Sequence, residues 1–187
     1  MNPLKNPTEI SGMLGESVTM RKLNGRVVIK NRPRRKVVAD PTEKQLVVFR
    51  KFKEAAQWAK KQIAKPDVDA LYAARVTDKV KSAFLVAVTD YLTAPTVESI
   101  DASQYNGAIG DAITAKVVDD FMVTKVTVII TDPTGKILEQ GQATQDPDME
   151  FLWSYAATVA NSAVAGTTVS VTGQDRARNQ TVLEKVL

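Results

Sequence analysis

"TKVTVIITDPTGKILEQGQATQ", residues 124–145, is the stretch that decides the fold of the C-terminal half. Val126, Val128 and Ile130 occupy every second position, an alternation typical of a strand with one buried face. In the "DPTG" that follows, Pro133 is second and Gly135 fourth, as a type I turn prefers. The stretch therefore predicts two antiparallel strands joined by a tight turn.

Further short strands are expected on both sides of this stretch, with turn residues between them. The alternation recurs in "DAITAKVVD" (111–119) and in "EFLWSYAAT" (150–158), where Phe151, Trp153 and Tyr155 share one face. Seven strands, an inward-facing tryptophan and no cysteine predict a disulfide-free immunoglobulin-like sandwich. The remaining strands are expected at 96–103, 166–175 and 179–187.

The N-terminal half contains the strongest helix pattern, "DPTEKQLVVFRKFKEAAQWAKKQIAK" (40–65). Asp40 is a suitable N-cap, Pro41 fits the first helical position, and Glu43 lies three residues after the cap. Apolar residues recur at spacings of three and four and predict one buried stripe. The stripe comprises Leu46, Phe49, Phe52, Ala56, Ala59 and Ile63.

Two shorter helices are expected at 66–76 and 78–92. Pro95, in the linker "LTAPTV" (92–97), disfavours helix at the preceding residue and so ends the last helix. Together with the strands, these helices predict an α+β chain: an N-terminal β-hairpin plus three-helix module followed by an all-β immunoglobulin-like sandwich.

The predicted hairpin precedes the helices, in "ESVTMRKLNGRVVIKNRP" (16–33). Asn24-Gly25 supplies the two positive-φ positions of a type I′ turn. Because an isolated hairpin with apolar residues on both faces is marginal in water, we expect it to need a partner. Trp58, beside the main helical stripe, is a further contact candidate, although burial explains it as well. The candidate assembly residues are Val18, Met20, Asn24, Gly25, Val27, Ile29 and Trp58.

Charge divides the chain at the same place as the secondary-structure pattern. Residues 1–94 carry 19 basic and 9 acidic side chains, whereas residues 95–187 carry 6 basic and 12 acidic ones. The net charges are therefore +10 and −6. Such asymmetry indicates separate modules, with a boundary between residues 94 and 95, and a basic half that favours an acidic partner. Solvated lysine-rich helix faces explain the basic half equally well.

The residue types that are missing exclude several classes of chemistry. With no cysteine and no histidine, the chain has no disulfide, thiolate nucleophile, zinc–thiolate site or histidine general base. No nucleotide-binding glycine motif is present. We therefore expect no enzymatic activity, cofactor or metal. The sequence also lacks a signal-like apolar segment and a membrane-spanning run, which predicts a soluble protein unless a leader has been removed.

Aspartates gather near the predicted strand ends, where calcium sites often take their oxygen ligands. No EF-hand spacing is present. Aspartate is also favoured in turns because its carboxylate accepts hydrogen bonds from nearby backbone, and we prefer this interpretation. The aspartates concerned are Asp119, Asp120, Asp132, Asp146, Asp148 and Asp175.

Residues 95–187 resemble the bacterial immunoglobulin-like and fibronectin-type modules of surface and phage proteins. The resemblance lies in "GDAITAKVVDD", "VTVIITDPTGKILEQG", "FLWSYAAT" and "AGTTVSVTGQDRARN". It implies a spacer, adhesin or assembly unit, and a virion or cell-surface location. Residues 10–94, with "SGMLGESV", "NGRVVIKNRP" and a lysine-rich helix, resemble small proteins of Bacteroidetes and their phages.

Two functions remain open from the sequence. The first is a structural protein that forms homo-oligomers, or contacts with other structural proteins, through the hairpin and helices; opposite charges on its halves would favour head-to-tail contacts. The alternative is nucleic-acid binding by the basic half, although no known nucleic-acid module surrounds the basic run. A carbohydrate-binding or adhesive sandwich rests on fold analogy alone. The candidate polyanion-binding residues are Lys30, Arg32, Arg34, Arg35 and Lys36.

Overall fold

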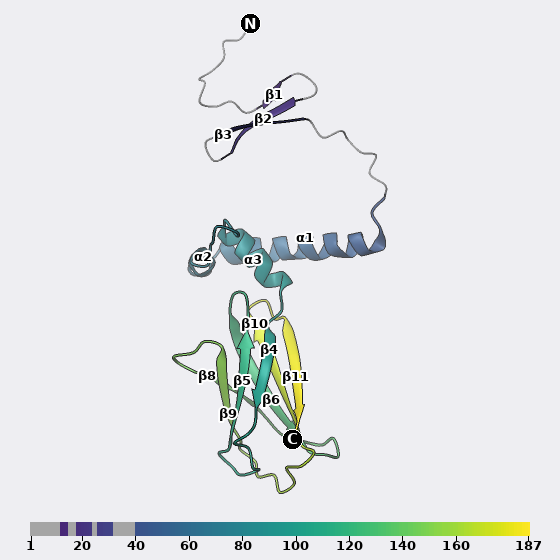
Figure 1. Ribbon diagram of the computed structural model, residues 1–187, viewed down its shortest axis with the longest axis vertical. Coiled ribbons are helices and arrows are strands. Elements are labelled where there is room, and N and C mark those ends of the chain that lie inside the picture. The colour runs from purple at the N-terminus through teal and green to yellow at the C-terminus, as the bar shows by residue number, and fades with distance from the viewer. Residues whose placement is uncertain (1–11, 15–17, 24–25, 32–39) are drawn as a thin grey trace. The chain divides into compact units, whose positions relative to one another are not determined.

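The chain has an α+β architecture, as predicted, with a small sheet, three helices and a β-sandwich (Figure 1). The computed structural model describes residues 12–14, 18–23, 26–31 and 40–187. These residues belong to two compact units, Met1–Gln45 and Leu46–Leu187. The boundary predicted between residues 94 and 95 falls inside the second unit, and the separation of two modules there stays a prediction.

The first unit contains a three-stranded antiparallel sheet in the order β1-β2-β3. Its strands are β1 (Gly12–Leu14), β2 (Val18–Leu23) and β3 (Arg26–Asn31). The last pair of β2 and β3 is Leu23 with Arg26, which leaves a two-residue connection and confirms the predicted hairpin. Asn24 and Gly25 themselves lie outside the described residues.

Helix α1 (Glu43–Ile63) begins with a capping box rather than with the cap predicted at Asp40. The Gln45 backbone N–H donates to Thr42 Oγ1 at 3.3 Å, and the Thr42 N–H donates to Gln45 Oε1 at 2.9 Å. This reciprocal pair satisfies two backbone groups at once, as a Thr-x-x-Gln sequence allows. The helix therefore starts two residues later than the predicted cap at Asp40 suggested.

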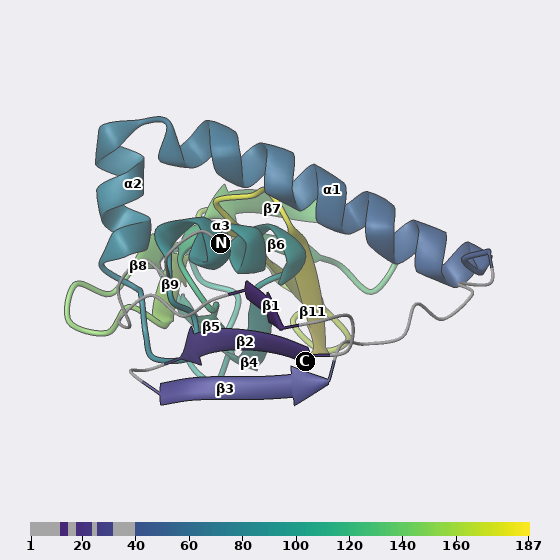
Figure 2. The ribbon, with the colours of Figure 1, turned by 90° about the horizontal axis from the view of Figure 1, so that it is seen from above.

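Helices α2 (Pro66–Ala73) and α3 (Ala83–Leu92) complete the helical part, with α2 turning sharply from the end of α1 (Figure 2). Ser82 caps α3, because its Oγ accepts from the Leu85 N–H at 3.3 Å. No helix among the described residues is long and apolar enough to cross a membrane.

The helices share a core of buried apolar side chains. One of them, Phe121, comes from the β5–β6 connection, so the helices pack against the sandwich. The members of this helical core are Ala55, Ala59, Val68, Tyr72, Val86, Ala87, Val88 and Phe121.

The sandwich has two four-stranded antiparallel sheets, ordered β4-β5-β9-β8 and β11-β10-β6-β7. This order is that of the ABED and GFC sheets of immunoglobulin domains, with one further strand beside the second sheet. The described residues thus form eight sandwich strands rather than the seven predicted. They are β4 (Thr96–Asp101), β5 (Ala112–Val118), β6 (Val123–Thr131), β7 (Ile137–Gln142), β8 (Thr144–Gln145), β9 (Leu152–Ala156), β10 (Thr168–Asp175) and β11 (Gln180–Val186).

The alternation predicted for the sandwich strands is confirmed by their burial. Val126, Val128 and Ile130 of β6 are buried. The alternate residues of β5 and β9 are buried as well: Ile113, Ala115, Val117, Trp153 and Tyr155. Phe151 was expected on the same face but is exposed, because β9 begins only at Leu152. The predicted turn is present as well: the Gly135 N–H donates to the Asp132 carbonyl at 3.0 Å, and Gly135 has a φ of 88°.

Candidate interaction surfaces

The hairpin sheet carries the assembly residues predicted for its strands on one face. Cross-strand partners share a face of a sheet, and Met20 pairs with Ile29 while Lys22 pairs with Val27. Val18, two residues from Met20, lies on this face too. Val18 and Met20 are half-buried, whereas Val27 and Ile29 are exposed, the latter by 62%. The structure therefore brings the four predicted strand residues together on one surface, where Val27 and Ile29 are exposed.

Helix α1 carries a second exposed apolar surface, the helix stripe, formed by Val48, Phe49 and Phe52. These side chains are 62%, 60% and 52% exposed. Val48 and Phe52 lie seven and three residues before Ala55, which is fully buried, so they extend the same face toward the N-terminus. The apolar stripe predicted for this helix is thus buried only in its C-terminal half. The helix stripe is exposed among the residues that the structure describes.

Lysines flank the helix stripe on both sides. Lys44 and Lys51 lie along one flank and Lys53 along the other, and all three are exposed. The acidic residues of α1 are Glu43 and Glu54. A rotation of about 100° per residue places both on the side of the helix opposite the helix stripe. The helix stripe is therefore an apolar surface with a basic rim, which favours an acidic partner.

Of the remaining sequence candidates, the structure describes Trp58 and Lys30. Trp58 is half-buried in the helical core, with its ring centroid 6.3 Å from Tyr72 and 5.6 Å from Tyr91. A role for Trp58 at an interface stays a prediction. Lys30 is exposed on β3, where its carbonyl accepts from Thr19 Oγ1 at 3.3 Å. The rest of the basic run, Arg32, Arg34, Arg35 and Lys36, lies outside the described residues.

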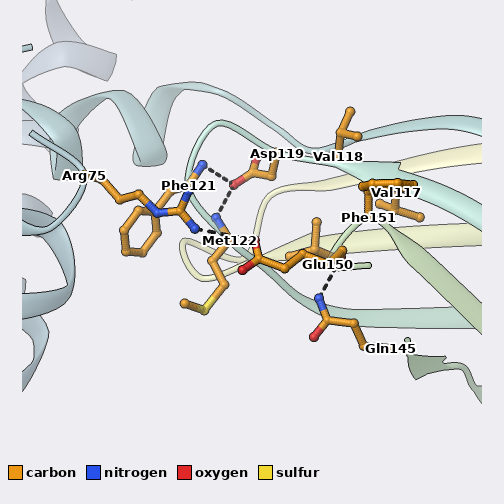
Figure 3. Close-up of a pocket in the computed structure, with 10 residues that line it drawn as sticks. Arg75, Val117, Val118, Asp119, Phe121, Met122, Gln145, Glu150 and Phe151 are labelled. Carbon is orange, nitrogen blue, oxygen red and sulfur yellow. Dashed lines mark hydrogen bonds and ion pairs between the residues drawn. The ribbon is translucent and has the colours of Figure 1, made fainter. Parts of the chain in front are cut away.

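A groove of about 300 Å³ opens beside β5 and the loop before β9; we call it the acidic groove (Figure 3). Its apolar lining comes from Val117, Val118, Phe121, Met122, Val123 and Phe151. Its polar lining comes from Arg75, Asp119, Gln145 and Glu150. Sequence reasoning missed this groove because its residues come from four separate segments.

Charges around the acidic groove are mainly negative. Arg75 is its one lining cation, and an Arg75 nitrogen lies 3.6 Å from a Glu150 oxygen, as Figure 3 shows. The loop that supplies Glu150 also carries Asp146 and Asp148. Gln145 Nε2 donates to the Glu150 carbonyl at 2.7 Å and so fixes this loop beside β8. The acidic groove is therefore an apolar depression with an acidic rim.

Four of the six aspartates near strand ends accept hydrogen bonds from nearby backbone N–H groups, as the preferred interpretation predicted; they are Asp119, Asp132, Asp146 and Asp175. Asp119 Oδ2 accepts from the backbone N–H groups of Phe121 and Met122 at 3.0 and 2.8 Å. Asp146 accepts in the same manner from two following residues. Among the described residues, no group of three or more acidic side chains is arranged to hold a metal ion.

The junction between helices and sandwich contains a buried carboxylate, which sequence reasoning did not single out. Asp90 in α3 is 2% exposed, and its Oδ2 accepts from the Tyr72 hydroxyl at 2.6 Å. Its Oδ1 has no hydrogen-bond partner in the part of the chain that the structure describes. Burial, with the nearby carboxylates of Asp175 and Asp119, raises the pKa of Asp90 to about 6.

Asn179 ties the end of α3 to the sandwich. Its Nδ2 donates to the carbonyls of Asp90, Tyr91 and Thr93 at 3.3, 3.2 and 3.1 Å. It also donates to Asp175 Oδ2 at 2.6 Å. One side-chain amide thus donates both to carbonyls at the end of the helix and to a buried carboxylate. The carbonyls at a helix end lack partners within the helix.

We expect Asn179→Ala to lower the free energy of unfolding by about 2 kcal/mol, because it leaves a buried carboxylate and several carbonyls without this donor. Urea denaturation followed by tryptophan fluorescence measures the loss. Asn106→Ala is the matched control: Asn106 is exposed, and we expect a change below about 0.5 kcal/mol. Equal effects of the two variants would contradict the role given to Asn179.

Comparison with known proteins gives similarities to solved structures alone. No protein-family model and no curated protein matches the chain. The chain is similar to CopC from Methylosinus trichosporium OB3b, with 16% identity and a TM-score of 0.37, over 48% of this chain and 87% of that one. It is also similar to a tetra-tandem repeat in the extending region of a large adhesion protein, with 21% identity and a TM-score of 0.33, over 48% of this chain and 22% of that one. The expected resemblance of residues 10–94 to Bacteroidetes and phage proteins has no counterpart in these matches and stays a prediction.

Proposed function

We propose that this chain is a non-enzymatic assembly protein, which makes protein–protein contacts through its hairpin and helices and projects an immunoglobulin-like sandwich. The observation that supports this most directly is the exposed helix stripe. Contiguous exposed apolar side chains with a polar rim mark interaction sites in soluble proteins. Two phenylalanines that continue a buried helix face fit a surface that becomes covered on association.

The hairpin adds a second surface of the same kind. Val27 and Ile29 expose apolar side chains next to half-buried Val18 and Met20. Covering an isoleucine or valine side chain contributes about 1.5 to 3 kcal/mol. A protein with two such surfaces and an immunoglobulin-like sandwich suits a filament, virion or cell-surface assembly.

Val27→Ser/Ile29→Ser is expected to weaken self-association at least about tenfold, because the contact loses apolar area worth more than 1.4 kcal/mol. Sedimentation velocity over a range of concentrations, at low and moderate salt, measures the association. Val28→Ser is the matched control, since it makes the same change on the opposite face of β3. A wild-type protein that stays monomeric at high concentration and low salt would refute the proposed function.

Nucleic-acid binding is the competing function, and one observation favours it: the basic residues of α1 are exposed. Phosphate contacts by such residues would weaken steeply as salt rises. A titration with duplex and single-stranded DNA at low salt decides between the two functions. Absence of binding removes this alternative, whereas binding that is lost in Arg34→Ala/Arg35→Ala would establish it.

A further inference from the structure

We propose that the helix stripe of one copy docks in the acidic groove of a second copy. This inference rests on the proposed function and names the partner of one of its surfaces. The first argument is charge. The helix stripe has exposed Lys44, Lys51 and Lys53 on its flanks, whereas the acidic groove is lined by Asp119 and Glu150. One chain thus carries both halves of an electrostatically complementary contact.

The second argument is apolar fit. Phe49 and Phe52 are spaced by three residues and lie next to each other on α1. A cavity of about 150 Å³ accommodates benzene, so a groove of about 300 Å³ has room for two phenyl rings. Its wall includes the exposed ring of Phe151, over which Lys116 Nζ lies 5.4 Å from the ring centroid, and the remaining ring surface offers contact to an entering phenylalanine.

The third argument excludes the simplest symmetric alternative. Pairing of two helix stripes would bring Lys44, Lys51 and Lys53 of one copy against the same lysines of the other. Like charges placed together at an interface disfavour association. The acidic groove replaces this repulsion by attraction, because its two lining carboxylates, Asp119 and Glu150, outnumber its one lining cation, Arg75.

A contact between two different surfaces is heterologous. It links copies head to tail, and the two ends of the row of copies keep one free helix stripe and one free acidic groove. Such contacts build rings if the rotation closes and open filaments if it does not. The assembly then grows with concentration rather than stopping at a symmetric dimer. Because the two surfaces differ, variants of one surface complement variants of the other, which distinguishes this docking from pairing of like surfaces.

The test uses two complementary variants of the full chain. The helix variant, Phe49→Gln/Phe52→Gln, removes the rings of the helix stripe. The groove variant, Glu150→Lys/Phe151→Ser, reverses one rim charge and removes one wall. All four side chains are exposed, so both variants keep the fold, which circular dichroism verifies. Each variant alone should associate at least tenfold more weakly than wild type in sedimentation velocity.

Mixing the two variants gives the deciding result. The groove variant still has an intact helix stripe and the helix variant an intact acidic groove, so an equimolar mixture should associate at least tenfold more tightly than either variant alone. Val47→Gln is the matched control: Val47 is exposed but shares its face with Lys51 and Glu54, and this variant should assemble like wild type. A mixture no tighter than its components overturns the proposal.

The remaining outcomes separate this proposal from the proposed function. If wild type assembles and the groove variant assembles equally well, the docking is wrong while the assembly function stands. If wild type stays monomeric, both are wrong. Cosedimentation with vesicles of anionic phospholipid tests a membrane as the partner of the helix stripe: binding that the helix variant loses and the groove variant keeps overturns docking to a second copy.

Discussion

The Asp90→Asn variant is expected to be more stable than wild type by up to about 3 kcal/mol at pH 8 and about equally stable near pH 4. The pKa of the Asp90 carboxyl rises from 3.8 to about 6 on folding, and each pKa unit corresponds to 1.36 kcal/mol. Burial is the main cause, and the carboxylates of Asp175 and Asp119 add to it, while Arg176 partly offsets them. Neutral asparagine keeps an acceptor for the Tyr72 hydroxyl and removes the buried charge.

The sign of the pH dependence follows from the raised pKa. A folded state that holds its proton more tightly gains stability at low pH, and this gain disappears as the pH rises through about 6. The stability of wild type relative to Asp90→Asn should therefore fall between about pH 4 and pH 7. Urea denaturation across this range measures both proteins. A difference that stays constant with pH would show that Asp90 is not the group responsible.

Gly141→Ala is expected to lower the free energy of unfolding by about 4 kcal/mol. The tyrosine ring of β9 lies directly over Gly141 of β7, and a Cβ at Gly141 would lie 2.8 Å from Tyr155 Oη. Overpacking of this kind costs about 1 to 3 kcal/mol. Displacement of the ring also breaks the hydrogen bond that the Tyr155 hydroxyl donates to Glu139 Oε2 at 2.8 Å. Loss of a hydrogen bond to a charged group costs about 1.5 to 3 kcal/mol more.

A double-mutant cycle isolates this close approach. The hydrogen bond to Glu139 matters here because this carboxylate is buried. Burial raises the pKa of the Glu139 carboxyl, but the hydrogen bonds donated by Thr158 and Tyr155 outweigh burial and hold that pKa below its usual value. In a Tyr155→Ala background the space beside Gly141 is open, so Gly141→Ala should cost less than about 1 kcal/mol there. An equal cost in both backgrounds would show that the ring is not the obstacle.

The sandwich was predictable because strand burial has a period of two that appears directly in the sequence. Val126, Val128 and Ile130 had to share a face in any strand, and the turn chemistry of Pro133 and Gly135 joined that strand to the next one. Helix α1 was predictable because its apolar residues also recur with a regular period. Its N-cap was not predictable, because two possible capping sequences overlap at residues 40–45. Only the backbone conformation of the folded chain selects Thr42.

The candidate surfaces were predictable only in part. The sequence by itself determined that Phe49 and Phe52 lie on the apolar face of a helix, and that Val27 and Ile29 share a face of a hairpin. Only the tertiary structure decided that these side chains stay exposed, because burial depends on what covers a face. The acidic groove was decided by tertiary structure alone, since Arg75, Val117 and Glu150 meet only after the helices and both sheets have packed. Periodicity is a property of neighbours in the chain, whereas a docking surface is made by neighbours in space.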